Sequence, residues 1–194
     1  MSKVNNIKTL AETKYLKLYN AEYTNKNGVL RNWSIASRKD LETINNKFFN
    51  GGEEKIDAVV IIARHIREDK LVIIRQFRVP INDYVIELPA GLIDGNESFN
   101  EAVKRELKEE TGLDLINIDY KNTKEKVYAS VGMTDESFAL VSCECDGVIS
   151  KEGLEADEDI EAMMLSREEA KDLLNSNENI DVKALLAIQN FIIS

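Results

Sequence analysis

The chain has 194 residues, of which 43% are hydrophobic and 31% charged, and its formal net charge is −10 at pH 7. This composition fits one folded domain, or one domain with a small appendage. The acidic charge argues against nucleic acid as the main partner, because phosphate backbones are bound by clustered Lys and Arg. No apolar run is long enough to span a bilayer, and the first ten residues lack the apolar segment of a secretory signal. We therefore predict a cytoplasmic protein without a membrane partner.

The first fifty residues are predicted to be rich in β-structure. Tyr15 to Tyr23 alternates apolar and polar side chains, and Arg31 to Ser37 is typical of a second strand. Asn50 to Gly52 then marks a break in the pattern. These signals divide the chain into an N-terminal β-rich region, residues 1–52, and a main body, residues 53–194.

The main body mixes predicted strands with helices. Ala58 to Ala63 is a continuous apolar run, as in a strand buried on both faces, and Leu71 to Phe77 follows it as a hairpin partner. Further strands are predicted at residues 126–130, 137–145 and 160–165, and helices at residues 98–112, 166–175 and 181–192. This order of elements predicts an α/β sandwich. Cys143 and Cys145 fall in one of the strands, where we expect two small side chains packed beside a sheet rather than a metal site.

The helix that follows Ser98 has distinct signals at both ends. Ser98 with Glu101 three residues later is a capping-box pattern, and Gly112 is suited to end the helix. The same pattern, Ser166 with Glu169, opens the next predicted helix. The capping boxes therefore predict where the two helices start, and Gly112 predicts where the first one ends.

One face of this helix combines apolar and acidic side chains. The apolar residues of the inward stripe are Phe99, Ala102 and Val103. Three carboxylates fall on or beside the same arc, those of Glu106, Glu109 and Glu110. Glu106 and Glu110 are like charges one turn apart, which is unfavourable unless a cation lies between them, and oxygen ligands without His or Cys favour Mg²⁺, Ca²⁺ or Mn²⁺. The alternative is a solvated Glu/Lys helix, since Lys104 and Lys108 form such a face.

The order of residues around these carboxylates carries a family resemblance. It reads Gly91, five residues, Glu97, seven residues, Arg105-Glu106-Leu107, one residue, Glu109-Glu110, one residue, Gly112-Leu113. This pattern resembles the Nudix box with every defining position filled. The resemblance implies an α/β/α sandwich with a mixed sheet, and hydrolysis of nucleoside diphosphates linked to another group with Mg²⁺ or Mn²⁺.

The resemblance also assigns roles within the box. The implied metal ligands are Glu106, Glu109, Glu110 and the carbonyl of Ala90. Arg105 and Glu97 would orient the helix and its carboxylates. The general base would come from the acidic loop at residues 151–159, where Glu155 and Glu158 are candidates that the sequence does not rank. Gly153 would let this loop close, and the alternative is an acidic surface loop without a catalytic role.

The segment before the box resembles the ADP-ribose pyrophosphatase subgroup. It contains Arg75-Gln-Phe-Arg78 and, after a variable stretch, Glu87-Leu-Pro-Ala-Gly91. The resemblance places Arg78 on the diphosphate, where a planar guanidinium suits phosphate oxygens. The implied reaction is Mg²⁺-dependent hydrolysis of ADP-ribose, or another ADP-sugar, to AMP and a sugar phosphate.

Similar enzymes use an N-terminal β region to form a homodimer and to stack adenine between aromatic side chains from two subunits. The matching positions are Tyr15 and Trp33, with Arg38 near the phosphates or the base, and Trp33 could instead only pack the dimer interface. Glu136, in the loop that meets the terminal ribose in this subgroup, is the candidate for a ribose hydroxyl or else a solvated carboxylate. Ser34 departs from the pattern, since some relatives have an acidic residue there that reads the base.

Three other functions compete with this prediction. One is a Nudix hydrolase for another nucleotide sugar or a dinucleotide. A second is a protein that binds ADP-ribose without cleaving it, which the complete set of box carboxylates disfavours. RNA decapping fits poorly with a net charge of −10 and no basic patch.

Overall fold

The structure is a computed structural model that describes residues 1–156 and 158–194. Contacts divide the chain into two compact units. The first consists of Met1–Asp57 with Val127–Phe138, and the second of Ala58–Lys126 with Ala139–Ser194. The predicted boundary after residue 52 therefore lies near the end of the N-terminal segment of the first unit, and a loop from the middle of the chain completes that unit.

The first unit is a three-stranded antiparallel sheet with one helix. Its elements are β1 (Lys3–Glu12), β2 (Lys17–Thr24), β3 (Leu30–Ser37) and α1 (Leu41–Phe49). The side chain of Asp40 caps α1 by accepting a hydrogen bond from the Thr43 amide. A buried hydrophobic cluster in this unit contains Ile7, Tyr19, Ala21 and Ile44.

The sequence prediction was incomplete in this unit. It missed β1 and α1, and it began the next strand at Tyr15, whereas β2 begins at Lys17. Burial explains why β1 was missed, because Ile7 is the only one of its ten residues that is buried. In α1, two consecutive Asn residues and a single buried side chain, Ile44, weaken both helix propensity and apolar periodicity.

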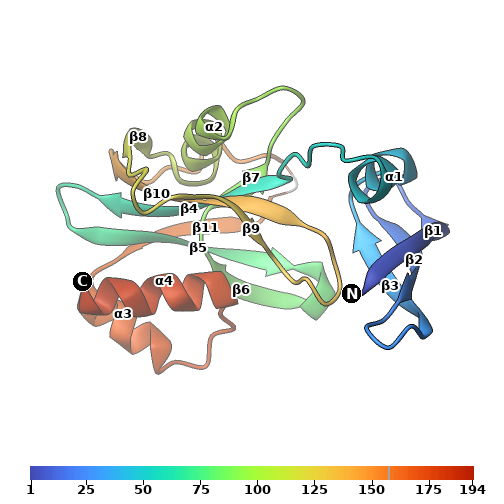
Figure 1. The fold of residues 1–194 in the computed structure, drawn as a ribbon. Helices are drawn as coiled ribbons and strands as arrows, with labels where there is room; N and C mark the ends of the chain where they lie inside the picture. Colours follow the sequence, from blue (N-terminus) through green and yellow to red (C-terminus); the bar gives the residue numbers. More distant parts are fainter. Residues whose placement is uncertain (157) are drawn as a thin grey trace. The chain divides into compact units, whose positions relative to one another are not determined.

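The second unit has the layered architecture that the sequence predicted. The strands of the large sheet are β4 (Ala58–His65), β5 (Lys70–Arg78), β6 (Asp83–Glu87), β7 (Ala90–Leu92), β8 (Asp114–Ile118), β9 (Lys124–Tyr128), β10 (Ser137–Asp146) and β11 (Ile160–Leu165). The main path runs β11-β5-β4-β10-β8, with β6 on β5, β7 on β4 and β9 on β10. Helix α2 (Phe99–Thr111) lies on one face, and α3 (Arg167–Leu174) and α4 (Val182–Ile193) on the other (Figure 1).

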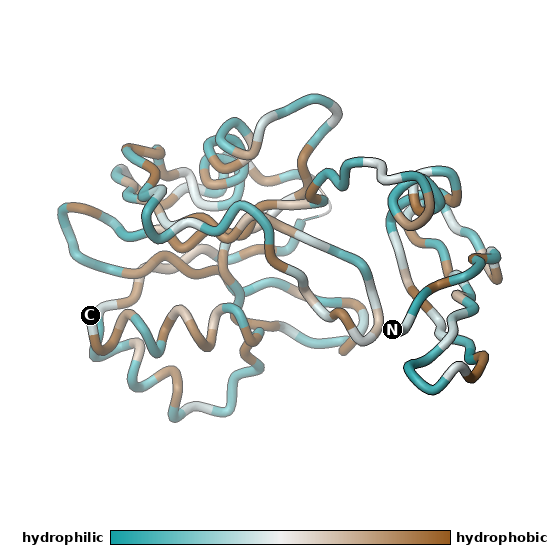
Figure 2. Tube along the Cα trace, in the orientation of Figure 1, coloured by the Kyte–Doolittle hydropathy of each residue, from teal (hydrophilic) through white to brown (hydrophobic). Residues whose placement is uncertain are grey.

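The central strands are the most apolar part of this unit, as Figure 2 shows along β4 and β5. These strands form the predicted antiparallel hairpin, in which Arg64 pairs with Leu71 and His65 with Lys70. The short strands β6 and β8 were not predicted, because each has five residues and lacks a long apolar run. Cys143 and Cys145 are buried on β10 and form no disulfide, as expected for two small side chains beside a sheet.

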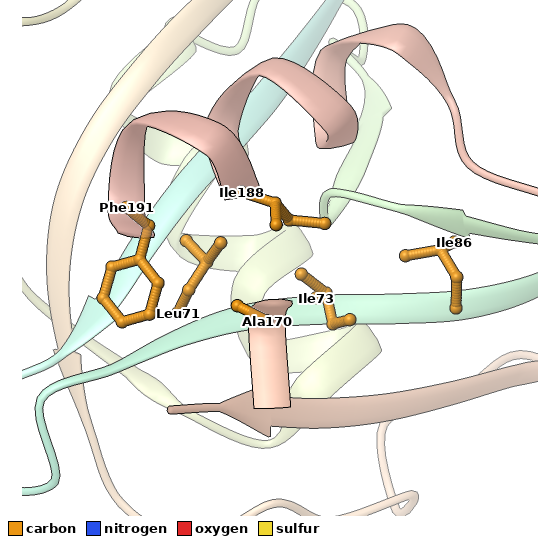
Figure 3. Close-up of a cluster of buried hydrophobic side chains, with 6 residues drawn as sticks. All are labelled: Leu71, Ile73, Ile86, Ala170, Ile188 and Phe191. Atoms are coloured by element: carbon orange, nitrogen blue, oxygen red, sulfur yellow. The ribbon is translucent and has the colours of Figure 1, made fainter. Parts of the chain in front are cut away.

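A buried cluster holds α3 and α4 against the sheet. It contains Leu71, Ile73, Ile86, Ala170, Ile188 and Phe191, which point toward one another from β5, β6, α3 and α4 (Figure 3). Burying each large side chain of this kind stabilises a fold by about 1.5–3 kcal/mol. The capping box predicted at Ser166 and Glu169 is present at the start of α3. In the described part of the chain, every helix is too short or too polar to cross a membrane.

Candidate active site

Helix α2 brings acidic side chains to the sheet, and its sequence signals explain where it starts and stops. The predicted capping box between Ser98 and Glu101 is formed, and Gly112 ends the helix in the left-handed conformation with φ of 77°. Val103 and Leu107 are fully buried beneath the helix. The caps and the buried side chains therefore set the orientation of α2, and this orientation determines which side chains face the sheet.

Two glutamates lie on that inner face. Glu106 is 8% exposed and Glu110 only 4% exposed. The pKa of Glu110 is raised to about 8, mainly by burial and also by the charges of Glu106 and Glu158, while a hydrogen bond from the Ala90 amide to Oε2 (2.9 Å) opposes the rise. Burial also raises the pKa of Glu106. The helix thus buries two carboxylates at a cost in stability that a cation would lower.

Arg105 compensates part of this charge. Its guanidinium contacts Glu97 through Nε (3.0 Å) and Nη2 (2.9 Å), and Nη2 also donates to the carbonyl of Leu92. Its Nη1 donates to Glu106 (2.7 Å) and to Glu109 (3.0 Å). Hydrogen bonds to Glu97 are the main cause of the raised pKa of Arg105, which keeps the guanidinium charged. The box arginine therefore links the start of the box to its carboxylates.

The donor set fits a hard divalent cation. Glu106, Glu109 and Glu110 offer only carboxylate oxygens, the ligands that Mg²⁺ and Mn²⁺ prefer. Among the described residues no three acidic, His or Cys side chains are grouped to hold an ion as they stand. Two of these glutamates contact Arg105 instead, and Glu110 accepts the Ala90 amide. Metal binding would therefore require small side-chain movements, and the metal roles, including that of the Ala90 carbonyl, stay predictions.

Gly91 leaves room for one of these carboxylates. Strand β7 passes α2 at Gly91, where an added Cβ would lie 1.8 Å from Oε1 and 2.3 Å from Oε2 of Glu106. Any larger residue would occupy the position of that carboxylate. The glycine that begins the box is thus explained by close approach rather than by backbone conformation, because it is not among the residues with positive φ.

The acidic loop is packed on the end of α2. The Ser150 amide donates to the carbonyl of Thr111 (3.0 Å), and a Cβ at Gly153 would lie 2.8 Å from both Cα and O of Glu109. Gly153 therefore allows the loop to pack closely against the backbone of Glu109, in addition to the conformational freedom that a glycine gives the loop. Within the predicted loop, Asp157 lies outside the described residues.

The two candidate bases differ in their surroundings. The charge of Glu158 is among the causes that raise the pKa of Glu106 and of Glu110, after burial, so Glu158 lies near both. Glu155 is exposed, and its amide donates to Oε2 of Glu158 (2.9 Å). The side chain of Glu158 is thus partly buried, and its charge acts on the carboxylates of α2.

Gly153→Ala is expected to lower kcat by roughly 10-fold or more, because the new methyl group would push the loop, and Glu158 with it, away from the backbone of Glu109. Steady-state kinetics at saturating Mg²⁺ would measure the effect. Lys151→Ala, an exposed change in the same loop, is the matched control and should retain activity. Equal activity of the two variants would contradict the packing role of Gly153.

Arg78 is a second basic residue that acts on the carboxylates of α2. It makes a bidentate ion pair with Glu87, from Nε to Oε1 (2.6 Å) and from Nη2 to Oε2 (2.8 Å). Glu87 is 8% exposed, and its hydrogen bonds are the main cause of the raised pKa of Arg78. The charge of Glu110 also raises this pKa, so Arg78 and Glu110 are close. The pair uses two of the five N–H donors of a guanidinium, which leaves donors to bind an anion.

Sequence reasoning assigned no role to Glu87. The residue stood in the pattern quoted before the box, but its partner was hidden because strand β6 was not predicted. The register of β5 with β6 pairs Arg78 with Asp83 and Ile74 with Glu87. Glu87 therefore lies four positions from Arg78 along the paired strands, and their two long side chains span that separation.

The predicted substrate residues of the first unit are also partly brought together. The Trp33 indole N–H donates to the carbonyl of Gly132 (3.1 Å), and Arg38 forms an ion pair with Glu136 (3.0 Å). Tyr15 is exposed and lies between β1 and β2, whereas Trp33 lies on β3, where it pairs with Ala21. The clamp of Tyr15 and Trp33 was predicted between two subunits, and it stays a prediction.

Comparison with known proteins agrees with this geometry. The NUDIX domain family matches residues 54–186, more than half of the chain. An ADP-ribose pyrophosphatase of Saccharomyces cerevisiae is 33% identical over 141 residues, 72% of this chain, and one of Bacillus subtilis is 33% identical over 153 residues, 78% of this chain. The chain spans 57% of the yeast protein and 80% of the Bacillus protein.

A solved structure described as an ADP compounds hydrolase shares the fold. It has a TM-score of 0.71 and 23% identity, and the match covers 99% of this chain and 91% of that one. At this identity the likeness concerns the fold alone. The matched residues include both the box on α2 and the sheet beneath it, so the chain belongs to the Nudix hydrolase family.

Proposed function

We propose that the protein hydrolyses the diphosphate bond of ADP-ribose, or of a closely related ADP-sugar, in a reaction that depends on Mg²⁺ or Mn²⁺. The products would be AMP and a sugar phosphate such as ribose 5-phosphate. The observation that carries this proposal is a chain of contacts in the second unit, in which Arg78 is paired with Glu87, and the amide of Ala90, three residues further along, donates to the buried Glu110. An anion-binding guanidinium beside a cation-binding carboxylate is what a diphosphate substrate with a divalent cation requires.

The relatives support the choice of substrate. Proteins named ADP-ribose pyrophosphatase from a yeast and a bacterium are each 33% identical to this chain. The segment around Arg78 and Glu87 carries the subgroup pattern. The proposal extends these names to this chain, and the substrate panel described below tests that extension.

The side chains of the second unit divide the chemistry between them. Glu106 and Glu110, with Glu109, would hold the cation, and Arg105 would keep their carboxylates in place. When bound, the cation would neutralise charge on the diphosphate and make a bound water more acidic. Arg78 would bind the diphosphate oxygens while Glu87 fixes its guanidinium.

We assign the general base to Glu158 rather than Glu155. Glu158 is partly buried and its charge acts on Glu106 and Glu110, whereas Glu155 is exposed. A base must lie within hydrogen-bond reach of the water that it deprotonates, and that water must lie near the metal ligands. In this arrangement Glu155 positions its neighbour through the hydrogen bond from its amide to Oε2 of Glu158.

Product analysis would test the proposal. Purified protein would be incubated with ADP-ribose, with other nucleotide sugars and with a dinucleotide cofactor, each with Mg²⁺ and with EDTA. We expect Mg²⁺-dependent AMP from ADP-ribose at a rate well above the others. Comparable turnover of several nucleotide sugars would overturn the narrow substrate claim, and tight binding without cleavage would instead identify a binding protein.

Arg78→Lys is expected to raise KM for the diphosphate substrate by roughly 10-fold, or about 1.4 kcal/mol of binding free energy. Lys offers a point charge and cannot reproduce both the bidentate pair with Glu87 and a planar contact with phosphate oxygens. Initial-rate kinetics would measure KM. The matched control is Arg75→Lys, the same change at an arginine of the same strand with a different partner. The Arg75 guanidinium lies over the Tyr84 ring at 4.1 Å. A similar rise in KM for both variants would argue against a specific role of Arg78.

A further inference from the structure

A loop from the middle of the chain is fastened to the N-terminal sheet within the first unit. Besides the indole bond from Trp33 to Gly132, the Ala36 amide donates to the carbonyl of Met133 (2.9 Å), and Ala36 forms a parallel bridge with Thr134. Arg38 then pairs with Glu136. Strand β3 and this loop, residues 130–136, therefore act as one structural piece although they lie almost a hundred residues apart.

A cluster of buried charged side chains, Lys39, Asp57 and Asp135, links the residues after β3 to this loop. The ammonium of Lys39 lies 2.7 and 2.8 Å from the two carboxylate oxygens of Asp57 and 3.4 Å from Oδ2 of Asp135. Their side chains are only 10%, 11% and 10% exposed, respectively. Asp57 also accepts a hydrogen bond from the Ser137 amide (2.9 Å), and the Asp57 amide donates to the carbonyl of Ser137 (2.8 Å). Lys39, two residues after β3, thus contacts Asp135 directly and is linked to Ser137 through Asp57.

Asp135 depends on this lysine more than Asp57 does. Within the described residues, neither carboxylate oxygen of Asp135 accepts a hydrogen bond, so its ion pair with Lys39 carries its charge compensation. Burial lowers the pKa of Lys39, but the hydrogen bond that its ammonium donates to Asp57 and the charge of Asp135 outweigh burial and raise the pKa, so the ammonium stays charged. Two buried carboxylates share one cation, and removing that cation leaves both uncompensated.

We propose that Lys39 is a positioning residue, which holds the loop against β3 so that Trp33, Arg38 and Glu136 keep their places as substrate-binding side chains. This inference rests on the proposed function for the role of those three residues. Lys39 itself is almost fully buried and bonded to two carboxylates, so it acts through the loop rather than on a ligand.

A cavity beside Trp33 shows what the loop contributes. It has a volume of about 220 Å³ and is lined by Trp33 and Tyr128, and by Val131, Met133 and Thr134 of the loop. Asp135 also lines it, although both of its carboxylate oxygens are buried. Release of the loop would remove three of the residues that line this cavity and would break the hydrogen bond from Trp33 to Gly132. The surroundings of Trp33 therefore report directly on the position of the loop.

Trp33 is the only tryptophan, so intrinsic fluorescence provides a test that needs no substrate. Trp33 is 51% exposed, and we expect Lys39→Met and Asp135→Asn to shift its emission maximum to longer wavelength as water replaces its apolar neighbours in the loop. Lys39→Arg should restore most of the wild-type spectrum, and Lys26→Met, an exposed change in the same unit, should leave it unchanged. If Lys39→Met fails to fold, Asp135→Asn keeps the test available, because the bond between Lys39 and Asp57 remains.

Turnover of the substrate identified by the panel completes the test. We expect KM to rise at least fivefold in Lys39→Met and in Asp135→Asn, with kcat within twofold of wild type, since the metal ligands lie in the other unit. A lower melting temperature with unchanged emission and unchanged KM would mean that the cluster only stabilises the fold and would overturn the proposal. A shifted emission with unchanged KM would equally overturn it, since the loop would then not position substrate-binding residues. The fluorescence result stands even if ADP-ribose is not the substrate.

Discussion

Glu110→Gln is expected to abolish Mg²⁺-dependent turnover and, at the same time, to stabilise the metal-free protein. The folded-state pKa of Glu110 is raised from 4.5 to about 8 by burial, so the folded state resists ionisation that the unfolded state allows. The stability of the metal-free protein therefore falls as pH rises from about 4.5 to about 8, by an amount on the order of 4 kcal/mol. Gln keeps an oxygen for the Ala90 amide and has no charge to bury.

Thermal unfolding in EDTA between pH 4 and pH 8 would measure this effect. The variant should lie slightly below the wild type near pH 4, by the cost of burying the amide, and should exceed it at pH 8 by roughly 2–3 kcal/mol after that cost. Added Mg²⁺ should raise the melting temperature of the wild type more than that of the variant. Glu125→Gln, at an exposed position, is the control for loss of one charge. A variant that turned over substrate at a near-normal rate would exclude Glu110 as a metal ligand.

Gly91→Ala is expected to reduce kcat by roughly 100-fold while leaving the fold intact. The added methyl group would lie where the carboxylate of Glu106 now lies, and that carboxylate is the end of a flexible side chain that can turn away. The backbone conformation of Gly91 is open to alanine, since its φ is not positive. The displaced Glu106 would lose its place beside Arg105, and with it the geometry for a cation.

The measurement is kcat over a range of Mg²⁺ concentrations, together with the melting temperature in EDTA. Leu92→Ala is the matched control, because Leu92 lies on the same short strand with its side chain exposed. The change removes that side chain and keeps the carbonyl that Arg105 contacts. Wild-type activity in Gly91→Ala would show that Glu106 has no need of the space. Unfolding of the variant would show that Gly91 has a wider structural role.

The sequence predicted best where a signal was local. The capping box at Ser98 and Glu101, the glycine that ends α2 and the hairpin of β4 and β5 each follow from residues a few positions apart, and all are confirmed. The inner face of α2 was also accessible, because helical spacing alone aligns Glu106 and Glu110 with buried apolar residues. Family resemblance then gave these carboxylates a role that geometry alone left open.

Features that depend on distant partners could not be predicted in this way. The ion pair of Arg78 with Glu87 needs the register of β5 and β6, and the cluster of Lys39 joins residues from three separate parts of the chain. The strand β1 is almost entirely polar or exposed, so its pairing with β2 rather than its own pattern defines it. Glu155 and Glu158 were equivalent in sequence, and only the fold of the loop separates them.

The contacts of Arg105 have a consequence for how the protein acquires its cation. Because this guanidinium already offsets part of the charge of Glu106 and Glu109, the fold depends less on a metal ion for its stability. An arriving ion must exchange places with an existing ion pair, so its net affinity is the difference between two favourable interactions. The side chain thus acts as an internal counter-ion that helps to keep the apoprotein folded and makes ion binding readily reversible. Substitution of this one residue would shift the concentration of free cation at which the enzyme becomes active.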